Sequence, residues 1–483
     1  MKLRAYRTIA NLTQQELSQQ LGVTELSIIK YEAGINIPSR ETMLRIYELT
    51  GGLVTPNDFF DLESISLSAT RGSPSNTFVV AGLMSGTSMD GIDGTLIITD
   101  GERFIKDIGS CSLDYDPEFK SLLKSCEQAV RENEGDLSKA RYDFEKKNKS
   151  IKFDTVVDKS TDLHAQVIHE LLKETGYKAK SIDLVGYHGQ TLFHRPTNGI
   201  TIQVGDGQRL ADQIGITVVC DFRSNDVKHG GQGAPFAPLY HKALAAQAGL
   251  APMVIANCGG ISNITVIGTT DKDLYAYDCG PGNTLIDRFV QQKIGKAMDQ
   301  DGIYGSSGTV NEKVLKALRE RALKLKDGSN YLDKEPPKSL DVNDQKFIPE
   351  LNTLSLQDGC ATLEAFTAEC IVESLDSLKF PIPKLWVLAG GGWQNPVITN
   401  ELKQRLKHKL GSDVRVQYAD QVGWNGKAME AQIFAYLAVR SLRKLPLSLP
   451  GTTGVQKPLT GGKIVFPKGD IKNASKAVRI LVG

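Results

Sequence analysis

The stretch AGLMSGTSMDGID, residues 81–93, leads a short apolar run directly into a turn of glycines, hydroxyls and carboxylates. Two interpretations fit such a turn. In the first, the polar residues only satisfy the backbone of a tight β-hairpin. In the second, backbone N–H groups and hydroxyls face an anion such as a phosphate, and a carboxylate beside them holds a metal ion. A short motif does not decide between the two, so the rest of the chain must.

Three further glycine clusters follow apolar runs in the second half of the chain. They are Gly259-Gly260 in MVIANCGGISNITVI, Gly280-Pro281-Gly282 in LYAYDCGPGNTLIDRFV, and Gly390-Gly391-Gly392 in LWVLAGGGWQNPVITNELKQRL. Each cluster lies where a strand of an open α/β sheet would end, which is where such sheets bind ligands. None of the three carries the lysine of a P-loop or the GxGxxG of a dinucleotide fold.

The first two glycine turns resemble each other, because both join two apolar strands in a hairpin (78–98 and 253–267). This internal repeat predicts a duplicated domain whose two hairpins grip phosphates from opposite sides, with a third glycine turn for the nucleoside. That layout is similar to the actin, sugar-kinase and Hsp70 superfamily. The analogy predicts a two-lobed α/β fold and says nothing of the substrate. Purely structural β-turns are the alternative.

The densest polar signal lies between residues 185 and 238. Asp221 follows the apolar run 216–220, and a flexible segment from Gly230 to Pro235 comes soon after. A carboxylate at a strand end beside a glycine-rich loop suits a general base. Phosphoryl transfer to a hydroxyl needs that base and a clamp on the phosphates. The alternative is an ion pair between Asp221 and Arg223, which would share one face of an extended strand.

Two further pairs of residues contain histidines that are candidates for a site. His188 and Gln190, in YHGQT, follow the apolar run 182–186 and are predicted to contact sugar hydroxyls, or else to satisfy a loop. His164 and His169 are five apart on a predicted helix and therefore lie on different faces. They do not form a metal-binding pair.

From about residue 78 to 466 the chain resembles the anhydro-N-acetylmuramic acid kinase family. Several separate motifs carry the resemblance in the right order: GLMSGTSMDG (82–91), HGQT (188–191), DFR with Asp226 and the segment 230–235, Asn257 with GGISN (259–263), Asp278 with GPGN (280–283), and GGG with Asn395. The resemblance implies an actin-like fold, ATP and Mg²⁺. It also implies a double reaction, in which water adds to the anomeric carbon of 1,6-anhydro-N-acetylmuramic acid while O6 accepts the γ-phosphoryl group. The product is N-acetylmuramic acid 6-phosphate, from the recycling of cell-wall murein.

The resemblance also assigns roles to individual residues. Asp221 is the catalytic base, and Asp90 is placed to hold Mg²⁺ directly or through water. Glu430, in GKAMEAQIFAYLA, matches a glutamate near the sugar; the alternative is a solvent-facing helix residue. The substrate residues are His188, Gln190, Thr191, Arg223, Gln232 and Glu430. The nucleotide residues are Gly86, Thr87, Ser88, Met89, Asp90, Gly91, Ile92, Asp93, Asn257, Gly259, Gly260, Asn263, Gly280, Gly282, Asn283, Gly390, Gly391, Gly392 and Asn395.

The sequence departs from the family pattern in three places. A helical segment precedes the kinase body, Cys279 stands where threonine is common, and Leu340-Asp341-Val342-Asn343 replaces the usual Thr-Gly-Arg-Glu. The altered loop is expected near the cleft between the lobes. Its change leaves open the rate of the reaction and the range of anhydrosugars that the chain accepts. It does not affect the predicted positions of the base and of the residues that hold the phosphates.

The first fifty residues resemble the Cro/repressor type of helix-turn-helix. Thr13 and Glu16 predict a capping box for a helix over 14–21, Gly22 a turn, and Thr24 the cap of a second helix ending near Gly34. The second helix offers Glu25, Ser27 and Lys30 but no arginine for a guanine. Residues 1–50 carry six Lys and Arg against five Asp and Glu, which is weak electrostatics for DNA. DNA binding and protein contact both remain open.

Length and composition set the outer limits. The chain of 483 residues has a net charge of +1 and seven scattered cysteines without a CxxC pair, so we expect no disulfide framework and no structural zinc. No apolar run is long enough for a membrane span, and the N-terminus lacks a signal-peptide core. We expect a reduced, cytoplasmic protein. The expected domains are a helical domain (1–60), a serine-rich linker (61–77), and a kinase body (78–483) with lobes near 78–250 and 251–440 and a C-terminal segment returning to the body.

Two classes of function compete. The first is a catalytic sugar kinase with an added regulatory or docking domain, and the second is a transcriptional regulator whose kinase-like body only senses a sugar. The presence of Asp221, Thr87, Ser88, Asp90 and Asn263 favours the enzyme, because a pure sensor does not need them. Ligand-driven closure of the lobes could couple both roles. The family suggests a homodimer.

Overall fold

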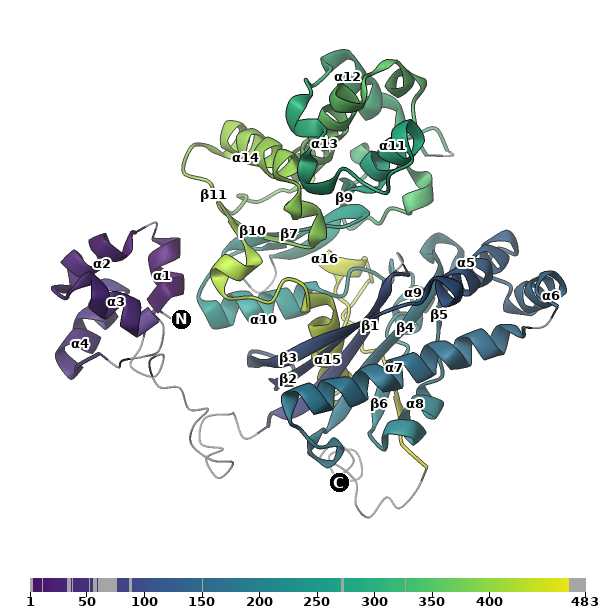
Figure 1. Cartoon of the computed structure of the whole chain (residues 1–483), viewed down its shortest axis with the longest axis horizontal. Coiled ribbons are helices and arrows are strands. Elements are labelled where there is room, and N and C mark those ends of the chain that lie inside the picture. Colours follow the sequence, from purple (N-terminus) through teal and green to yellow (C-terminus); the bar gives the residue numbers. More distant parts are fainter. Residues whose placement is uncertain are drawn as a thin grey trace.

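The chain from residue 78 onward forms two α/β lobes, and a small helical domain precedes them (Figure 1). The computed structural model describes residues 3–10, 12–32, 36, 38–51, 53–54, 59, 76–86, 89–149, 151–270, 273–325 and 327–468. Thr87, Ser88, residues 61–75 of the expected linker and the segment 469–483 lie outside these residues. None of the helices in the described part of the chain is long and apolar enough to cross a membrane.

The first lobe is built on a seven-stranded sheet. Its strands are β1 (Phe78–Ser85), β2 (Gly91–Thr99), β3 (Ile105–Asp114), β4 (Leu184–Arg195), β5 (Ile200–Val204), β6 (Val218–Cys220) and β12 (Lys463–Val465). The order is β12-β6-β4-β1-β2-β3, with β5 paired to β4. Its helices are α5 (Pro117–Glu132), α6 (Leu137–Lys147), α7 (Phe153–Thr175), α8 (Gly207–Ile214) and α9 (Ser224–Lys228).

The second lobe has a five-stranded sheet in the order β11-β10-β7-β8-β9. Its strands are β7 (Met253–Cys258), β8 (Ile261–Ile267), β9 (Leu274–Pro281), β10 (Leu385–Ala389) and β11 (Arg415–Tyr418). Its helices are α11 (Thr284–Ile294), α12 (Glu312–Arg321), α13 (Leu356–Ser374) and α14 (Pro396–Leu410). The 3-10 helices are η3 (Ala179–Ser181), η4 (Pro196–Asn198), η5 (Gln300–Gly302), η6 (Gly305–Ser307), η7 (Tyr331–Asp333), η8 (Val342–Asp344), η9 (Pro349–Thr353), η10 (Leu375–Ser377), η11 (Gly391–Gln394) and η12 (Ala419–Val422).

The two sheets repeat one topology, as the paired hairpins predicted. In the first lobe β1, β2 and β3 form an antiparallel meander, and β4 and then β6 continue the sheet parallel to β1. In the second lobe β7, β8 and β9 form the same meander, and β10 and then β11 continue it parallel to β7. The glycine turns after β1 and β7 are therefore equivalent positions in a duplicated fold.

Two helices lie between the sheets, α10 (Pro238–Ala248) and α15 (Met429–Leu442) (Figure 1). A Cβ added at Gly82 or Gly186 would sit 2.0 Å from the Ala431 carbonyl oxygen or 2.1 Å from that of Phe434. Only glycine permits α15 to approach β1 and β4 so closely. The chain therefore returns to the first lobe with α15, before the boundary expected near residue 440. The short helix α16 (Pro450–Thr453) follows it.

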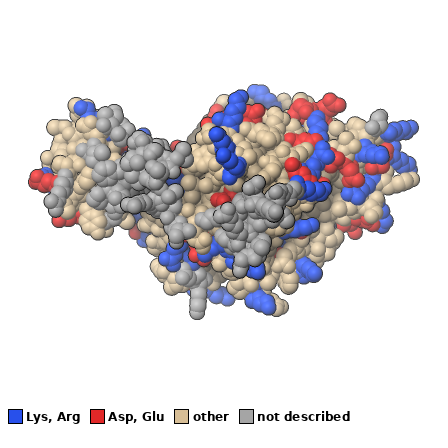
Figure 2. Space-filling model, turned by 90° about the horizontal axis from the view of Figure 1, so that it is seen from below, with Lys and Arg blue, Asp and Glu red and all other residues tan. Residues whose placement is uncertain are grey.

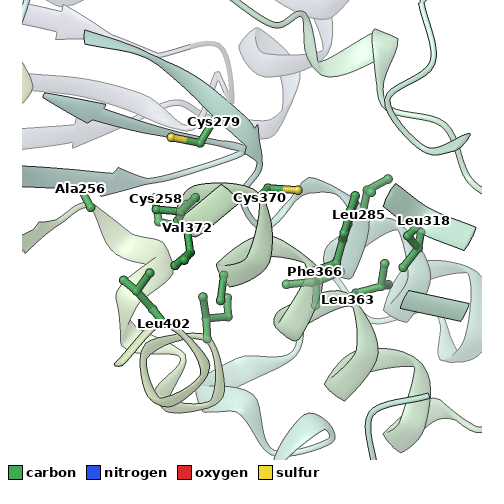
Figure 3. Close-up of a cluster of buried hydrophobic side chains, with 14 of the residues drawn as sticks. Ala256, Cys258, Cys279, Leu285, Leu318, Leu363, Phe366, Cys370, Val372 and Leu402 are labelled. Atoms are coloured by element: carbon green, nitrogen blue, oxygen red, sulfur yellow. The ribbon is translucent and has the colours of Figure 1, made fainter. Parts of the chain in front are cut away.

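A buried hydrophobic cluster of the second lobe packs against the strands that lead into its glycine turns. Cys258 at the end of β7 and Cys279 near the end of β9 belong to one buried cluster with Cys370 and Phe366 of α13 (Figure 3). All seven cysteines of the chain are free, as expected, and these three behave as small buried apolar groups. The strand ends that carry the turns are thus fixed from below by packing.

The helical domain consists of α1 (Leu3–Ile9), α2 (Gln14–Leu21), α3 (Glu25–Glu32) and α4 (Arg40–Leu49). The capping box of Thr13 and Glu16 is present, and Gly22 takes the left-handed conformation that ends α2. Both features confirm the predicted helix-turn-helix. The domain has its own small core, which includes Leu17, Leu21, Ile28 and Ile46.

Candidate active site

The strand ends of the first lobe bring the predicted site residues to one level of the sheet. Gly186 of β4 pairs with Gly82 of β1 and with Val219 of β6. Two residues further along these parallel strands lie Met84, His188 and Asp221. Asp93 of β2 lies opposite Met84. Residues at equivalent positions of neighbouring strands are close in space, so Asp93, His188 and Asp221 occupy one edge of the sheet.

Asp221 is exposed and has a backbone φ of 54°. Its Oδ1 accepts a hydrogen bond from the Ser224 N–H at 3.4 Å. Among the described residues Asp221 forms no ion pair with Arg223, so the alternative drawn from the sequence is not observed. An unusual backbone conformation that aims an uncommitted carboxylate into solvent is typical of a functional position.

Arg223 is held on several sides by the first lobe and α15. Its Nε donates to Nε2 of His188 at 3.0 Å, and its Nη1 donates to the Gly233 carbonyl at 2.6 Å. The guanidinium carbon lies 5.5 Å from the ring centre of Phe236 and 6.0 Å from that of Phe434. Burial lowers the pKa of Arg223 to about 10, although Glu430 and Asp226 oppose the shift. The side chain thus remains a cation at neutral pH, in a fixed orientation.

The glycine-rich segment 230–235 is organised by a buried carboxylate. Asp226 accepts hydrogen bonds from the Gly233 N–H at 2.6 Å and from Oγ1 of Thr453 at 2.5 Å. Gln232 reaches the other lobe, since its Oε1 accepts a bond from Oγ of Ser339 at 2.8 Å. The segment is therefore braced by hydrogen bonds close in sequence to Asp221 and is tied to both lobes.

The four residues of the HGQT motif lie within β4, which continues to Arg195. Gln190 is fully buried, and its amide donates to the Gly86 carbonyl at 2.8 Å. Its amide nitrogen thus holds the first glycine turn, while its Oε1 has no hydrogen-bond partner among the described residues. His188 is also buried, and Thr191 is half-buried with Oγ1 3.4 Å from the Gln203 amide.

The first glycine turn is described on both sides of Thr87 and Ser88. Met89 follows with a φ of 54° and is buried, and Ile92 is buried in β2. Asp90 is exposed and forms an ion pair with Lys120 of α5. In the described part of the chain no group of three or more His, Cys, Asp and Glu side chains could hold a metal ion. A cation at this turn would thus rest on one carboxylate and on ligand oxygens, as Mg²⁺ commonly does.

Glu430 lies in the first turn of α15, one helical turn before Phe434, which contacts the His188 ring at 4.5 Å. The carboxylate is open to solvent, yet the surrounding protein and Asp93 raise its pKa, and Arg223 opposes this. Burial and then Asp114 raise the pKa of Asp93. Glu430 is therefore an exposed carboxylate on a tightly packed helix, and its electrostatic neighbours are Asp93 and Arg223.

The three glycine turns of the second lobe converge. A Cβ at Gly282 would lie 2.1 Å from the Gly259 carbonyl oxygen, and one at Gly390 would lie 2.3 Å from Oδ1 of Asn257. A Cβ at Gly392 would lie 2.5 Å from the Cys258 sulfur and 3.0 Å from Oδ1 of Asn283. Strand register aligns Asn257 with Asn263, and Asn263 with Asp278. Backbone without side chains beside a row of polar groups is a cradle that fits the phosphates and sugar of a nucleotide.

The Asn395 side chain lies at the start of α14. Its Oδ1 accepts bonds from the Val397 and Ile398 N–H groups and so caps α14, and its amide donates to Glu364 at 2.6 Å. Both ends of this amide are used within the protein. Asn395 supports the third glycine turn from behind.

Comparisons with known proteins agree with this geometry. The model of the anhydro-N-acetylmuramic acid kinase family matches residues 78–467. The chain belongs to that family. A relative of that name from Methylorubrum populi is 41% identical over 80% of this chain and 98% of its own length, and one from Rhizobium johnstonii is 42% identical over 80% and 98%. A helix-turn-helix model matches residues 3–52.

Among solved structures, component A of the (R)-2-hydroxyglutaryl-CoA dehydratase of Acidaminococcus fermentans is 12% identical, with a TM-score of 0.37 over 75% of this chain and 99% of that chain. Membership of the kinase family implies ATP as the phosphoryl donor and typically a divalent cation.

On the face shown in Figure 2, acidic and basic side chains intermingle over the lobes, as the net charge of +1 leads one to expect.

Asp278 belongs to the DCGPGN motif, but the sequence alone predicts no role for its carboxyl. Its Oδ2 accepts a bond from the Leu340 N–H at 2.8 Å, and its own N–H donates to the Lys338 carbonyl at 3.0 Å. Burial raises the pKa of Asp278 to about 7, while the Leu340 N–H and Lys338 oppose the shift. The altered loop 340–343 is thus anchored at the polar row of the second lobe.

The Asp278 carboxyl should make stability depend on pH. Its pKa rises from 3.8 to about 7 on folding. The protonated carboxyl therefore stabilises the fold below the lower value, and this contribution is lost as the pH rises through the higher one. We expect Asp278→Asn, which keeps the acceptor for Leu340, to flatten the fall in melting temperature between about pH 5 and about pH 8. Calorimetry of both proteins without ligands would test this, and parallel curves would contradict it.

Proposed function

We propose that the chain opens 1,6-anhydro-N-acetylmuramic acid with water and phosphorylates O6, using Asp221 as the base. The observation that carries the proposal is the position of Asp221 at the strand edge with Asp93 and His188, on the lobe opposite the converging glycine turns. Two lobes that each end in a ligand-binding turn suit a reaction between a sugar and a nucleotide.

Asp221 takes a proton from the water that attacks the anomeric carbon. The new C1–O bond supplies electrons as the C1–O6 bond breaks, so O6 leaves as a developing alkoxide. O6 then needs no separate acid if it bonds to phosphorus. ATP with Mg²⁺ supplies that phosphoryl group when bound. The exposure of Asp221 favours its role as the base, because its carboxylate forms no ion pair that a substrate would have to displace.

The residues present fit the nucleotide and the cation. The glycine turns around Gly259, Gly282 and Gly392 would hold the phosphates and the nucleoside, with Asn257 and Asn263 beside them. Asp90 would hold Mg²⁺ after release from Lys120. Glu430, Arg223 and Gln232 would contact the sugar, whereas Gln190 and Asn395 would act through the turns that they support.

Isotope labelling tests the function. The purified full-length protein would be incubated with ATP, Mg²⁺ and the anhydrosugar in ¹⁸O-water, and the product analysed by mass spectrometry. We expect a 6-phosphate with the label at C1. A 6-phosphate without the label would refute water activation, and no turnover of a sugar that still binds would favour the sensor.

The observations on the helical domain do not favour a DNA-reading function. Arg7 pairs with Glu32 and Arg45 with Glu41, so these cations are already neutralised. The exposed side of α3 carries Leu26 and Ile29. We therefore keep the enzyme as the function of the chain and do not propose the sugar-sensing regulator.

A further inference from the structure

Two carboxyl groups meet in the interior of the second lobe. Glu364 of α13 is fully buried, Asp299, just before η5, is 6% exposed, and the two carboxyls are within hydrogen-bond contact of each other. Within the described part of the chain, no Lys or Arg side chain forms an ion pair with either. Two buried carboxylates in contact cannot both stay charged, because burial and mutual repulsion each disfavour the second charge. One proton must therefore lie between them.

The hydrogen bonds around the pair assign this proton to Glu364. Asp299 accepts the Tyr304 N–H at Oδ1 and the Gly305 N–H at Oδ2, each at 2.9 Å, and such bonds favour its charged form. Glu364 accepts only the Asn395 amide, at Oε1 and 2.6 Å, and its Oε2 has no partner among the described residues. Burial raises the pKa of Glu364 to about 8, with help from Asp299 and against the effect of the Asn395 amide. Glu364 is thus the acid that donates and Asp299 the carboxylate that accepts.

The other titratable neighbours also favour a neutral Glu364. Cys360 lies one turn earlier on α13, and its thiol is in hydrogen-bond contact with Asp299. Burial and then the charges of Asp299 and Glu364 raise the pKa of this thiol, so it stays protonated and brings no charge. Glu401 of α14 adds a further negative charge, which opposes the ionisation of Glu364.

Glu364 is connected to the third glycine turn through one side chain. The amide of Asn395 donates to Glu364, while the Asn395 N–H donates to the Gly392 carbonyl at 3.2 Å. The Oδ1 of Asn395 is used at the same time to cap α14. The position of the turn therefore depends on where Glu364 holds Asn395.

The segment that follows Asp299 packs on the same two side chains. A methyl group at Gly302 would collide with Oδ1 of Asn395, and one at Gly305 would collide with Oε2 of Glu364. Bare backbone is thus pressed against both groups. The acid pair joins α13, α14, this segment and the third glycine turn at one buried point.

We propose that Glu364 and Asp299 share one proton and that this pair positions the third glycine turn for the nucleotide, acting through Asn395. The inference rests on the proposed function for the place of the nucleotide at residues 390–392. Glu364 is a positioning residue, because it touches Asn395 and not the nucleotide. Loss of the proton puts two negative charges in contact, which separates the segment 299–305 from α13 and releases Asn395. ATP affinity should therefore fall as the pH rises.

Titration calorimetry of the full-length protein with ATP and excess Mg²⁺ tests the proposal. Between about pH 7 and about pH 9 the Kd should rise by up to about tenfold, because the protonated fraction of Glu364 falls by that factor. Glu364→Gln keeps an acceptor for Asn395 and a donor for Asp299 without titrating. It should bind ATP as the unchanged protein does at the lower pH, with almost no dependence on pH. Glu320→Gln, at an exposed glutamate of α12, is the matched control and should keep the dependence.

Glu364→Ala separates positioning from a merely structural role. It removes both bonds and should weaken ATP binding about tenfold at every pH, whereas Glu364→Gln restores the affinity. An equal pH dependence of the Kd in Glu364→Gln and in the unchanged protein would overturn the positioning role, whatever happens to the melting temperature.

Infrared spectroscopy examines the shared proton without any ligand. At neutral pH the unchanged protein should show the band of a protonated buried carboxyl, and Glu364→Gln should lose it. Identical spectra would refute the shared proton. A protein that shows this band and binds no ATP at any pH would instead refute the place given to the nucleotide, and with it the positioning role.

Discussion

Asp221→Asn should lower kcat by roughly 10²–10⁴-fold while the KM values for sugar and ATP change little, because only proton transfer from water is lost. The amide has nearly the same size and cannot accept that proton. The substitution also suits the backbone. Asp221 has a φ of 54°, a conformation that asparagine adopts as readily as aspartate and that alanine does not.

The measurement is steady-state kinetics with both substrates, together with the melting temperature of the variant. Asp226→Asn is the matched comparison, since this carboxylate lies nearby but is buried and braces the segment 230–235. It should lower the melting temperature as well as the rate. A fully active Asp221→Asn would refute the base assignment, and the search for the base would then move to Glu430 and Asp93, at the same edge.

The duplicated fold could be predicted from the sequence because its signals are local. Each glycine turn follows an apolar strand within a few residues, and two such hairpins predict two equivalent sheets. The capping box of Thr13 and Glu16 is equally local and was correctly predicted. Features set by neighbours three or four residues away are those that a sequence pattern records best.

The roles of Gln190 and Asn395 could not be read from the sequence. Both lie in motifs that surround the ligand, so both were predicted to contact it. In the structure Gln190 bonds to Gly86, more than a hundred residues away, and Asn395 bonds to Glu364. Which side of a strand or turn a side chain takes depends on these long-range partners. A motif therefore identifies the neighbourhood of a site, but not which of its residues touch the ligand.

The role of the Asp278 carboxyl could not be predicted from the sequence for a related reason. Its carboxyl matters through the loop that follows Pro337, and the sequence does not show that Leu340 closes on it. The strand alternation offered one usable signal: Asp278 of β9 lies opposite Asn263, which is opposite Asn257. An alignment of the three strand ends from the hairpin register would have placed it in the polar row.

Gly282→Ala should disrupt the second lobe at the point where its glycine turns meet. The new methyl group would lie 2.1 Å from the Gly259 carbonyl oxygen, and it cannot move aside because the turns are bonded to each other. Gly282 donates its N–H to the Gly260 carbonyl at 3.0 Å, and Asn283 donates to that of Gly259 at 2.7 Å. We expect a destabilisation of about 1–3 kcal/mol, typical of overpacking, and a loss of ATP affinity of at least about tenfold.

Gly391→Ala separates the two effects. No heavy atom lies within 4 Å of its added Cβ, so the fold has room for the methyl group. Its melting temperature should stay close to that of the unchanged protein, while ATP binding by calorimetry should weaken if the nucleotide approaches this backbone. The pair therefore distinguishes a turn that holds the lobe together from one that faces the ligand. Normal ATP affinity in both variants would contradict the placement of the nucleotide at the converging turns, because both substitutions then leave its site intact.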